Sequence, residues 1–179
     1  RSPKKEIFST RSFGNRITER AELKAALAAH AEIVGAKLRR QASVAGAMMI
    51  FASNSPHDKT GFQRKSTHIS FTIPTSDTRA LLAAISSAMD QLFRFGIPYY
   101  RCGVGLLDIS PMHRQQFDLF HPTPDDRGLM ACMDSINGRY GRNTMHLAAK
   151  GFDQKFSMRR EFLSPQYTTR WRDIPIIRC

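Results

Sequence analysis

The sequence is poor in the residues that build disulfide frameworks and metal sites. Its three cysteines, Cys102, Cys132 and Cys179, are far apart, and none belongs to a CxxC pair. An odd number of isolated cysteines predicts neither a disulfide framework nor a structural zinc site, and it favours a reducing compartment. The six histidines show no HxxxH or HxxE spacing. We therefore expect neither a metal nor another cofactor in this chain.

Long hydrophobic runs are also lacking. The longest apolar stretch, residues 45–52, is far shorter than the roughly 20 residues that a membrane-spanning helix needs. No apolar signal segment lies near the start, and the chain begins with Arg1 instead of methionine. We expect a piece of a longer protein, located in the cytoplasm and without a membrane partner.

Acidic residues are outnumbered. The chain holds 15 Asp and Glu against 27 Lys and Arg, which gives a formal net charge of +12 and a sequence pI near 10.3. Such an excess favours a polyanionic partner such as nucleic acid. The carboxylates do not suit two-metal chemistry, because Asp108 is solitary and Asp125 and Asp126 are neighbours in a proline-rich stretch. The sequence predicts a binding module without a catalytic centre.

Hydrophobic periodicity predicts the order β-α-β-β-α-β. The expected strands cover residues 7–17, 48–52, 66–73 and 99–107, and the expected helices run from an N-cap at Thr18 to near Gly46 and over residues 77–95. This is the split βαβ, or ferredoxin-like, arrangement of an α+β domain. Two helices would cover one face of a four-stranded sheet and leave the other face bare.

The bare face is the expected binding surface. Alternation along the third and fourth strands places on it Ser66, His68, Ser70, Arg101, Gly103 and Gly105. Small, polar and cationic side chains suit phosphates and sugars, since glycine allows close approach of the backbone and arginine forks onto phosphate oxygens. A sheet face that is merely solvated would show the same pattern.

The texture of the sequence changes after residue 110. Residues 111–124 contain Pro111, Pro122 and Pro124 and are expected to form an extended linker. Residues 125–179 would follow as a small α/β tail, with a helix over 125–140 and a strand over 144–149. The predicted division is thus a domain over residues 1–110, a linker over 111–124 and a tail over 125–179.

The linker contains a short candidate docking peptide. Its residues are Gln116, Phe117, Asp118, Leu119 and Phe120. This segment resembles the peptide that binds the bacterial sliding clamp, Gln-Leu-Ser/Asp-Leu-Phe, and departs from it at Phe117. Leu119 and Phe120 would enter an apolar pocket while the Gln116 amide pairs with backbone at its rim. The alternative is a linker that folds these side chains back onto its own domain.

Several segments together resemble one family. The segments RSFGNRI, PTSDTR, QFDLF and SMRREFLSPQYTTRWRDIP look like the C-terminal portion of the UmuC family, the catalytic subunit of DNA polymerase V and its mobile-element relatives. The resemblance implies that residues 1–110 are the little finger of a Y-family translesion polymerase, whose bare sheet lies across the backbone of template-primer DNA. It also implies a role in SOS mutagenesis and DNA repair, and a bacterial, nucleoid-associated location.

The same resemblance defines what this piece would lack. The family's Mg²⁺ ions are held by palm-domain carboxylates, which would precede Arg1, so the piece itself is not expected to be an enzyme although its parent would be a DNA-directed DNA polymerase. Further partners implied by the resemblance are a UmuD-type dimer and a recombinase filament.

Eight residues are expected to contact DNA. They are Arg11, Ser12, Gly14 and Arg16 in the first strand, Arg64, Lys65 and Ser66 entering the third, and Arg101 in the fourth. Arg11, Ser12 and Gly14 lie in a segment that resembles the family, whereas the other five rest on charge and alternation.

Two alternatives to DNA holding stay open. A protein-interaction domain would use the sheet or the basic tail to bind UmuD-type and recombinase partners. A free-standing RNA-binding domain of this fold would expose aromatic side chains on its central strands for base stacking, and the polar run Ser66, His68 and Ser70 argues against it.

Overall fold

The computed structural model describes residues 4–58, 61–115, 125–151, 168 and 171–174. Within them the strands are β1 (Ile7–Ile17), β2 (Ser43–Ser53), β3 (Arg64–Thr75) and β4 (Tyr99–Pro111). The helices are α1 (Arg20–Arg40), α2 (Thr78–Leu92) and α3 (Arg127–Tyr140), with short 3-10 helices η1 (Met112–Arg114), η2 (Ala148–Lys150) and η3 (Trp171–Asp173). The α+β class and the β-α-β-β-α-β order are confirmed.

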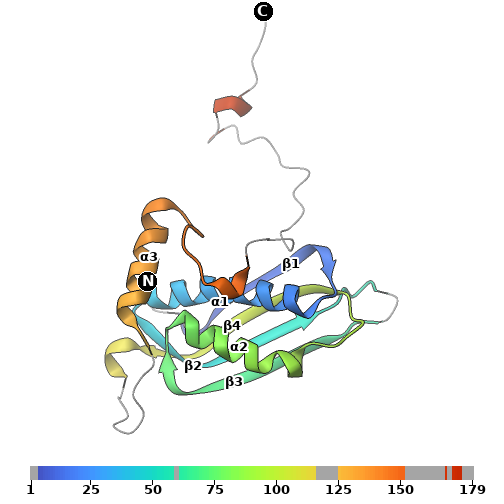
Figure 1. The fold of residues 1–179 in the computed structure, drawn as a ribbon, viewed down its shortest axis with the longest axis horizontal. Coiled ribbons are helices and arrows are strands. Elements are labelled where there is room, and N and C mark those ends of the chain that lie inside the picture. Colours follow the sequence, from blue (N-terminus) through green and yellow to red (C-terminus); the bar gives the residue numbers. More distant parts are fainter. Residues whose placement is uncertain (1–3, 59–60, 116–124, 152–167, 169–170, 175–179) are drawn as a thin grey trace, which may run out of the picture.

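The strands form one sheet in the order β1-β4-β2-β3, and every neighbouring pair is antiparallel. β1 and β2 therefore run parallel with β4 between them, and β3 and β4 run parallel with β2 between them. These are two interlocked split βαβ units, closed by α1 and α2. Both helices cross the same face of the sheet (Figure 1). The ferredoxin-like topology expected from the sequence is not confirmed in its exact form, and the sequence did not specify that β4 and β2 occupy the centre.

The core lies between this face and the two helices. Its most deeply buried side chains include Leu23, Leu27, Val34 and Leu38 of α1, Leu81, Ile85, Met89 and Leu92 of α2, and Met48, Ile50, Val104 and Leu106 of the sheet. The apolar stripes predicted for both helices are thus confirmed. Each such side chain contributes about 1.5–3 kcal/mol when it leaves water, so this layer dominates stability.

The first helix begins one residue later and ends several residues earlier in the structure than the sequence suggested. Its N-cap is Glu19, not Thr18, and no side chain caps the helix there. The helix ends at Arg40, and Ala42 takes a positive φ of 51°. The small residues up to Gly46 belong to β2, where pairing with β4 begins at Ser43 and Pro111. Sheet pairing overrides the helical continuation that periodicity allowed.

The second helix is bounded by local chemistry. Asp77 caps its start, with Oδ1 accepting from the backbone N–H of Arg79 at 2.8 Å. The helix ends at Leu92, short of the expected residue 95, and the chain turns at Gly96 with a φ of 82°. The turn delivers Tyr99 to β4, where its hydroxyl accepts a hydrogen bond from the backbone N–H of Arg94 at 2.8 Å.

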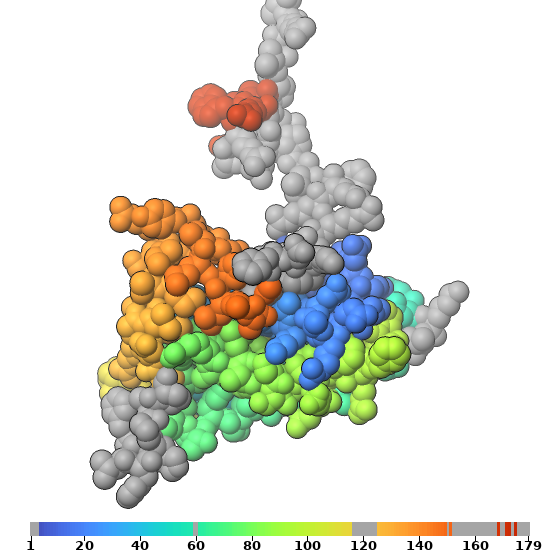
Figure 2. Space-filling model, viewed as in Figure 1, coloured from blue at the N-terminus to red at the C-terminus, as the bar shows by residue number. Residues whose placement is uncertain are grey.

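The helix expected after the linker is present and packs against the domain. Asp126 caps α3 by accepting from the backbone N–H of Leu129 at 2.9 Å, and Met130 and Met133 are buried. Arg39 of α1 donates two hydrogen bonds, of 2.7 and 2.8 Å, to the carboxylate of Asp134 of α3. Figure 2 shows α3 at one end of the domain and η2 against the helical layer beside it.

The strand expected over residues 144–149 is wrong. The Asn137 side chain donates to the carbonyl oxygen of Met145 at 2.8 Å and accepts from its N–H at 2.9 Å. Leu147 donates its N–H to Glu32 at 2.8 Å, and its side chain packs on the core. Side chains therefore satisfy backbone groups that a strand would have paired.

The residues on either side of 116–124 are held at the same place. Gln115 donates through Nε2 to the carbonyl oxygen of Pro74 at 2.7 Å. Asp125 accepts from Thr75 Oγ1 at 2.6 Å, and Arg127 donates to Gln115 Oε1 at 3.1 Å. The first residues of the expected linker instead belong to β4 and η1.

Candidate nucleic-acid interface

The face of the sheet opposite the helices carries the candidate site. Along β3, side chains alternate between exposed and half-buried, as predicted from the sequence. The strand register aligns Gly103 with Phe51 and Phe51 with Ser66, and in the next row Gly105 with Met49 and Met49 with His68. The predicted placement of Ser66, His68, Gly103 and Gly105 on one face is confirmed.

One row of this face holds two arginines. Ser12 pairs with Arg101, Arg101 with Ser53, and Ser53 with Arg64, so the four residues cross the whole sheet from β1 to β3. Both arginines are exposed, and neither forms an ion pair within the described part of the chain. The row therefore presents two arginines without an ion-pair partner, one on either side of the buried Ser53, with the half-buried Ser12 beyond Arg101. Arginine suits phosphate oxygens.

Both arginines are held by neighbours on the face. The Arg64 guanidinium lies over the Phe51 ring, 4.7 Å from its centroid. Arg101 donates through Nη2 to Thr10 Oγ1 at 3.2 Å. Stacking and hydrogen bonding restrict these long side chains, which lowers the entropy that a bound phosphate would otherwise cost.

The two glycines of β4 serve a different purpose from the one expected. A Cβ on Gly103 would lie 2.7 Å from both the Phe51 ring and the Thr10 methyl group. A Cβ on Gly105 would collide with the Phe8 ring. The glycines thus make room for aromatic rings of the neighbouring strands, so their backbone is covered and not open to close approach of a ligand.

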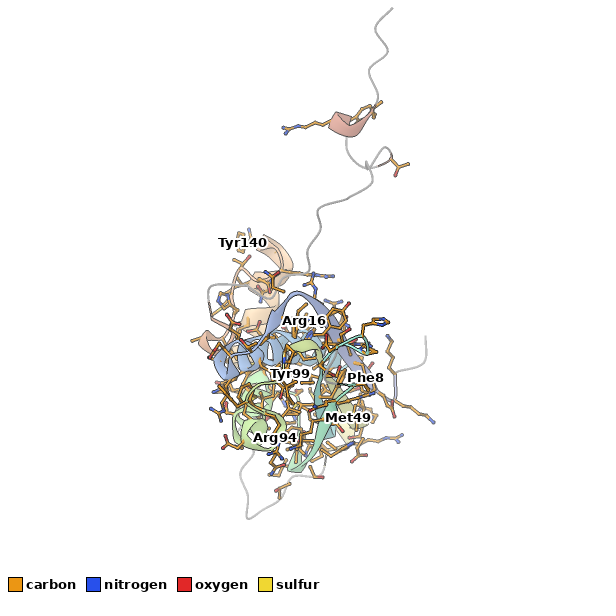
Figure 3. All side chains as sticks on the ribbon, turned by 90° about the vertical axis from the view of Figure 1, so that its right-hand side faces the viewer. Phe8, Arg16, Met49, Arg94, Tyr99 and Tyr140 are labelled. Carbon is orange, nitrogen blue, oxygen red and sulfur yellow. The ribbon has the colours of Figure 1, made fainter. Side chains whose placement is uncertain are left out.

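The sequence reasoning missed the apolar part of this face. Phe51 is buried and Phe8 is 40% exposed, and the register adds Met49 beside them. In Figure 3, Arg94 lies on the side of the sheet that carries α2, and Phe8 and Met49 lie on the opposite side. Alternation could have found Phe51, because it shares parity with Met49 and opposes the buried residues Ile50 and Ala52.

Two of the eight expected DNA-contacting residues lie on the other face. Arg11 pairs with the buried Cys102, and Lys65 pairs with the buried Ala52, so both point to the helical side. The pKa of His30 in α1 reflects this placement, since burial and then the charges of Arg11 and Lys37 lower it from 6.5 to about 4. These cations do not join the arginine row.

The other six expected residues lie in or near the arginine row. Ser12, Arg64, Ser66 and Arg101 lie on the exposed face. Gly14 lies in the irregular stretch where the pairing of β1 with β4 shifts. In the same stretch Arg16 bonds Asp58 at 3.0 Å and lies 4.5 Å from the ring centroid of Tyr100, so its charge is already countered.

No group of three or more His, Cys, Asp or Glu side chains that could hold a metal ion occurs in the described residues. In the same part of the chain, no helix has the length and apolar character needed to cross a membrane. The candidate clamp peptide, Gln116 to Phe120, lies outside the described residues.

Comparisons with known proteins give two family models and a solved structure. A family model described as the impB/mucB/samB family C-terminal domain matches residues 4–119. A second model, described as a domain of unknown function (DUF4113), matches residues 127–177. Among solved structures, the complex of the beta-clamp processivity factor and the little finger domain of PolIV aligns with a TM-score of 0.43 and 17% identity, over 64% of this chain and 97% of that chain.

Similar sequences cover nearly all of the chain. The MucB proteins of Salmonella typhimurium and Escherichia coli are each 35% identical over 177 residues, and UmuC of Salmonella typhimurium strain LT2 is 32% identical over 175 residues. These alignments cover 97%, 97% and 96% of the chain, but the chain spans only 42%, 41% and 42% of the relatives. Because the first family model covers more than half of the chain, this protein belongs to the impB/mucB/samB family and contains the family's C-terminal domain.

Proposed function

We propose that this chain is the DNA-binding and clamp-tethering C-terminal region of an error-prone translesion DNA polymerase, without a catalytic centre of its own. The observation that carries the proposal is the arginine row on the exposed face, in which Arg101 lies between Ser12 and Ser53, and Arg64 follows Ser53. Membership of the impB/mucB/samB family supports the assignment, as does the similarity of MucB and UmuC to nearly the whole of this chain. Mg²⁺ would belong to the parent polymerase.

The exposed face would grip duplex DNA without reading its sequence. Serine hydroxyls and arginine guanidinium groups bind phosphate oxygens, which carry no base information. Proteins that read the bases of single strands stack them on exposed aromatic rings of the central strands. Phe51, the aromatic residue of the central strand β2, is only 5% exposed and cannot serve in this way. Backbone-dominated binding is what a polymerase needs when it moves along lesions of unknown sequence.

The peptide Gln116 to Phe120 would bind the sliding clamp. In support, Gln115 and Asp125, on either side of residues 116–124, are both bonded to the end of β3, and Asp125 also accepts from the N–H of Ser76 just after it. A docking peptide between two fixed ends loses less conformational entropy on binding than one on a free tail. We also propose the division into a DNA-binding domain over 1–110, a tether over 111–124 and a tail over 125–179.

The test is a salt titration of the chain with a blunt duplex. The logarithm of affinity should fall linearly with the logarithm of salt concentration, with a slope of roughly −0.9 for each phosphate neutralised. Affinities for unrelated sequences should agree within about twofold, because base edges are not read. An affinity that does not change with salt would contradict the DNA half of the proposal.

The clamp half is tested separately. In a pull-down on immobilised bacterial clamp, the variant Leu119→Ala/Phe120→Ala should lose binding while its duplex affinity stays at the wild-type value. A matched control, Tyr140→Ala, removes an exposed aromatic ring from α3 without touching the peptide or the residues that hold its ends. Unchanged clamp binding in the double variant would remove the peptide from the proposal.

As a second proposal, the same face binds a protein partner. The exposed side chain of Phe8 favours this role. This aromatic side chain is 40% exposed beside Gly105, and aromatic residues are enriched in protein interfaces. UmuD-type dimers and a recombinase filament are the candidate partners. Phe8→Ala should weaken such a complex and leave the affinity for duplex DNA unchanged. An equal loss of both affinities would mean that one surface binds both partners.

A further inference from the structure

A second basic and aromatic surface lies around the edge of the sheet from the exposed face. An open depression of ≈ 400 Å³, here called the loop-end depression, is lined among others by Phe62, Arg64, Lys65 and Arg94. Phe62 comes from the loop between β2 and β3, and Arg94 comes from the turn between α2 and β4. Figure 3 looks onto this end of the molecule, with Arg94 on the side of α2.

The charge of the depression is one-sided. None of the described residues that line it is acidic. Among the described residues, none of its three cations, Arg64, Lys65 and Arg94, takes part in an ion pair. Other arginines of the domain do have an acidic partner, as Arg20 has in Asp90 at 2.6 Å and Arg16 has in Asp58 at 3.0 Å. A hollow with three unmatched cations attracts an anionic ligand.

Two phenylalanines stand exposed at the same end. Phe62 is 56% exposed and Phe95, next to Arg94, is 95% exposed. Phe93, two residues before Phe95 in the same turn, instead packs on Tyr99 with ring centroids 5.9 Å apart. The turn therefore separates an inward ring from an outward one. Rings held out in water beside cations are the elements of a stacking platform.

We propose that the loop-end depression binds an unpaired strand of nucleic acid, with bases stacked on Phe62 and Phe95 and phosphates held by Lys65 and Arg94. Only unpaired bases offer both π-faces to protein side chains, because the bases of a duplex are stacked on one another. Cations alone would accept either form, and the exposed rings select the single strand.

The two surfaces are continuous through Arg64. Its guanidinium stacks on Phe51 of the exposed face, and the same residue lines the depression. A duplex on the sheet could thus pass an unpaired extension around the β3 edge into the depression. The inference builds on the proposed DNA-binding function, from which it differs in the strand form and in the residues that bind it.

The experiment compares two labelled probes of equal length, a single-stranded oligothymidylate and a blunt duplex, on the whole chain by fluorescence anisotropy. The variant Phe62→Ala/Phe95→Ala should lose about tenfold or more of its affinity for the single strand, since each base–aromatic stack contributes about 1–3 kcal/mol. Its duplex affinity should stay within twofold of the wild type. Both side chains are exposed, so the fold should persist, and circular dichroism checks this.

The matched control is Tyr140→Ala, which removes a 66% exposed aromatic ring from α3. It should leave both affinities unchanged. Wild-type affinity of the double variant for the single strand would overturn the inference, as would an equal loss for both probes. A separate failure of duplex binding in the wild type would count against the proposed function instead, because the single-strand result does not depend on it.

Discussion

Arg39 and Asp134 form a two-bonded ion pair between α1 and α3, residues that lie 95 positions apart in the chain. The Arg39 side chain is 13% exposed, and its Nη1 also donates to the Ser76 carbonyl oxygen and to Thr78 Oγ1, each at 2.8 Å. One guanidinium thus joins the end of α1, the start of α2 and the middle of α3.

Loss of this guanidinium should loosen α3. We expect Arg39→Ala to lower the free energy of unfolding by about 2–3 kcal/mol. The change leaves Asp134, the Ser76 carbonyl oxygen and Thr78 Oγ1, which are partly buried, without this donor. Urea unfolding measures the loss, and amide hydrogen exchange should show faster exchange in α3. Arg20→Ala removes an exposed pair with Asp90 and should cost at most about 1 kcal/mol. Equal losses in the two variants would contradict the special role of Arg39.

Alanine at Gly103 should destabilise the sheet more than alanine at Gly105. The Phe51 ring next to Gly103 is 5% exposed and cannot swing away, whereas Phe8 next to Gly105 is 40% exposed and can rotate into solvent. We expect about 1–3 kcal/mol for Gly103→Ala by thermal or urea unfolding. In the double variant Gly103→Ala/Phe51→Ala the two losses should not add, since the collision with the ring is gone and only the contact with the Thr10 methyl group remains. Strict additivity would contradict the contact.

Acid should destabilise the protein through His30. Burial, together with the charges of Arg11 and Lys37, lowers the pKa of this side chain from 6.5 to about 4. Between those values the unfolded chain binds a proton that the folded chain does not. The free energy of unfolding should therefore be fully retained above pH 6.5 and fall toward pH 4, by at most about 1.4 kcal/mol per pH unit.

The variant His30→Asn should flatten this dependence in urea unfolding measured across the same pH range. His68→Asn, which changes an exposed histidine of β3, is the control and should keep the wild-type slope. An unaltered slope in the His30 variant would assign the acid sensitivity to other groups.

The two described cysteines should differ in reactivity. Cys102 is fully buried in β4, and this burial raises the pKa of its thiol, while Cys132 on α3 is exposed. Alkylation followed by peptide mass spectrometry should label Cys132 within minutes and Cys102 only after denaturation. Labelling of Cys102 at the rate of Cys132 in the folded chain would contradict the placement of β4 in the core.

The order of elements could be read from the sequence because it depends on local periodicity. The stripe of Leu23, Leu27, Val34 and Leu38 and the alternation of β3 each lie within one segment, and the structure confirms both. Strand order and the fit of Phe51 over Gly103 depend on register between distant segments, which no local pattern contains. The predicted strand over 144–149 failed because Asn137 and Glu32 satisfy its backbone.

The candidate site was predicted in part for the same reason. Alternation within β3 and β4 placed Ser66 and Arg101 correctly on the exposed face. Arg11 was chosen for its charge, although it shares parity with the buried residues Ile7 and Phe13. That parity was the available signal that Arg11 points toward α1.

The central claim is that the exposed face, and not the overall positive charge, holds DNA. Two double variants remove the same charge from opposite faces of the sheet: Arg64→Ala/Arg101→Ala from the exposed face and Arg11→Ala/Lys65→Ala from the helical face. Both lower the formal net charge from +12 by two. Long-range attraction alone would therefore weaken DNA binding equally in the two.

The decisive measurement is the affinity of each variant for a blunt duplex across a salt series. We predict that Arg64→Ala/Arg101→Ala reduces the steepness of the log-log salt slope by about 1 for each arginine, while Arg11→Ala/Lys65→Ala keeps the wild-type slope. Equal slopes in the two variants, or a larger reduction for the helical face, would contradict the assignment of DNA binding to the exposed face.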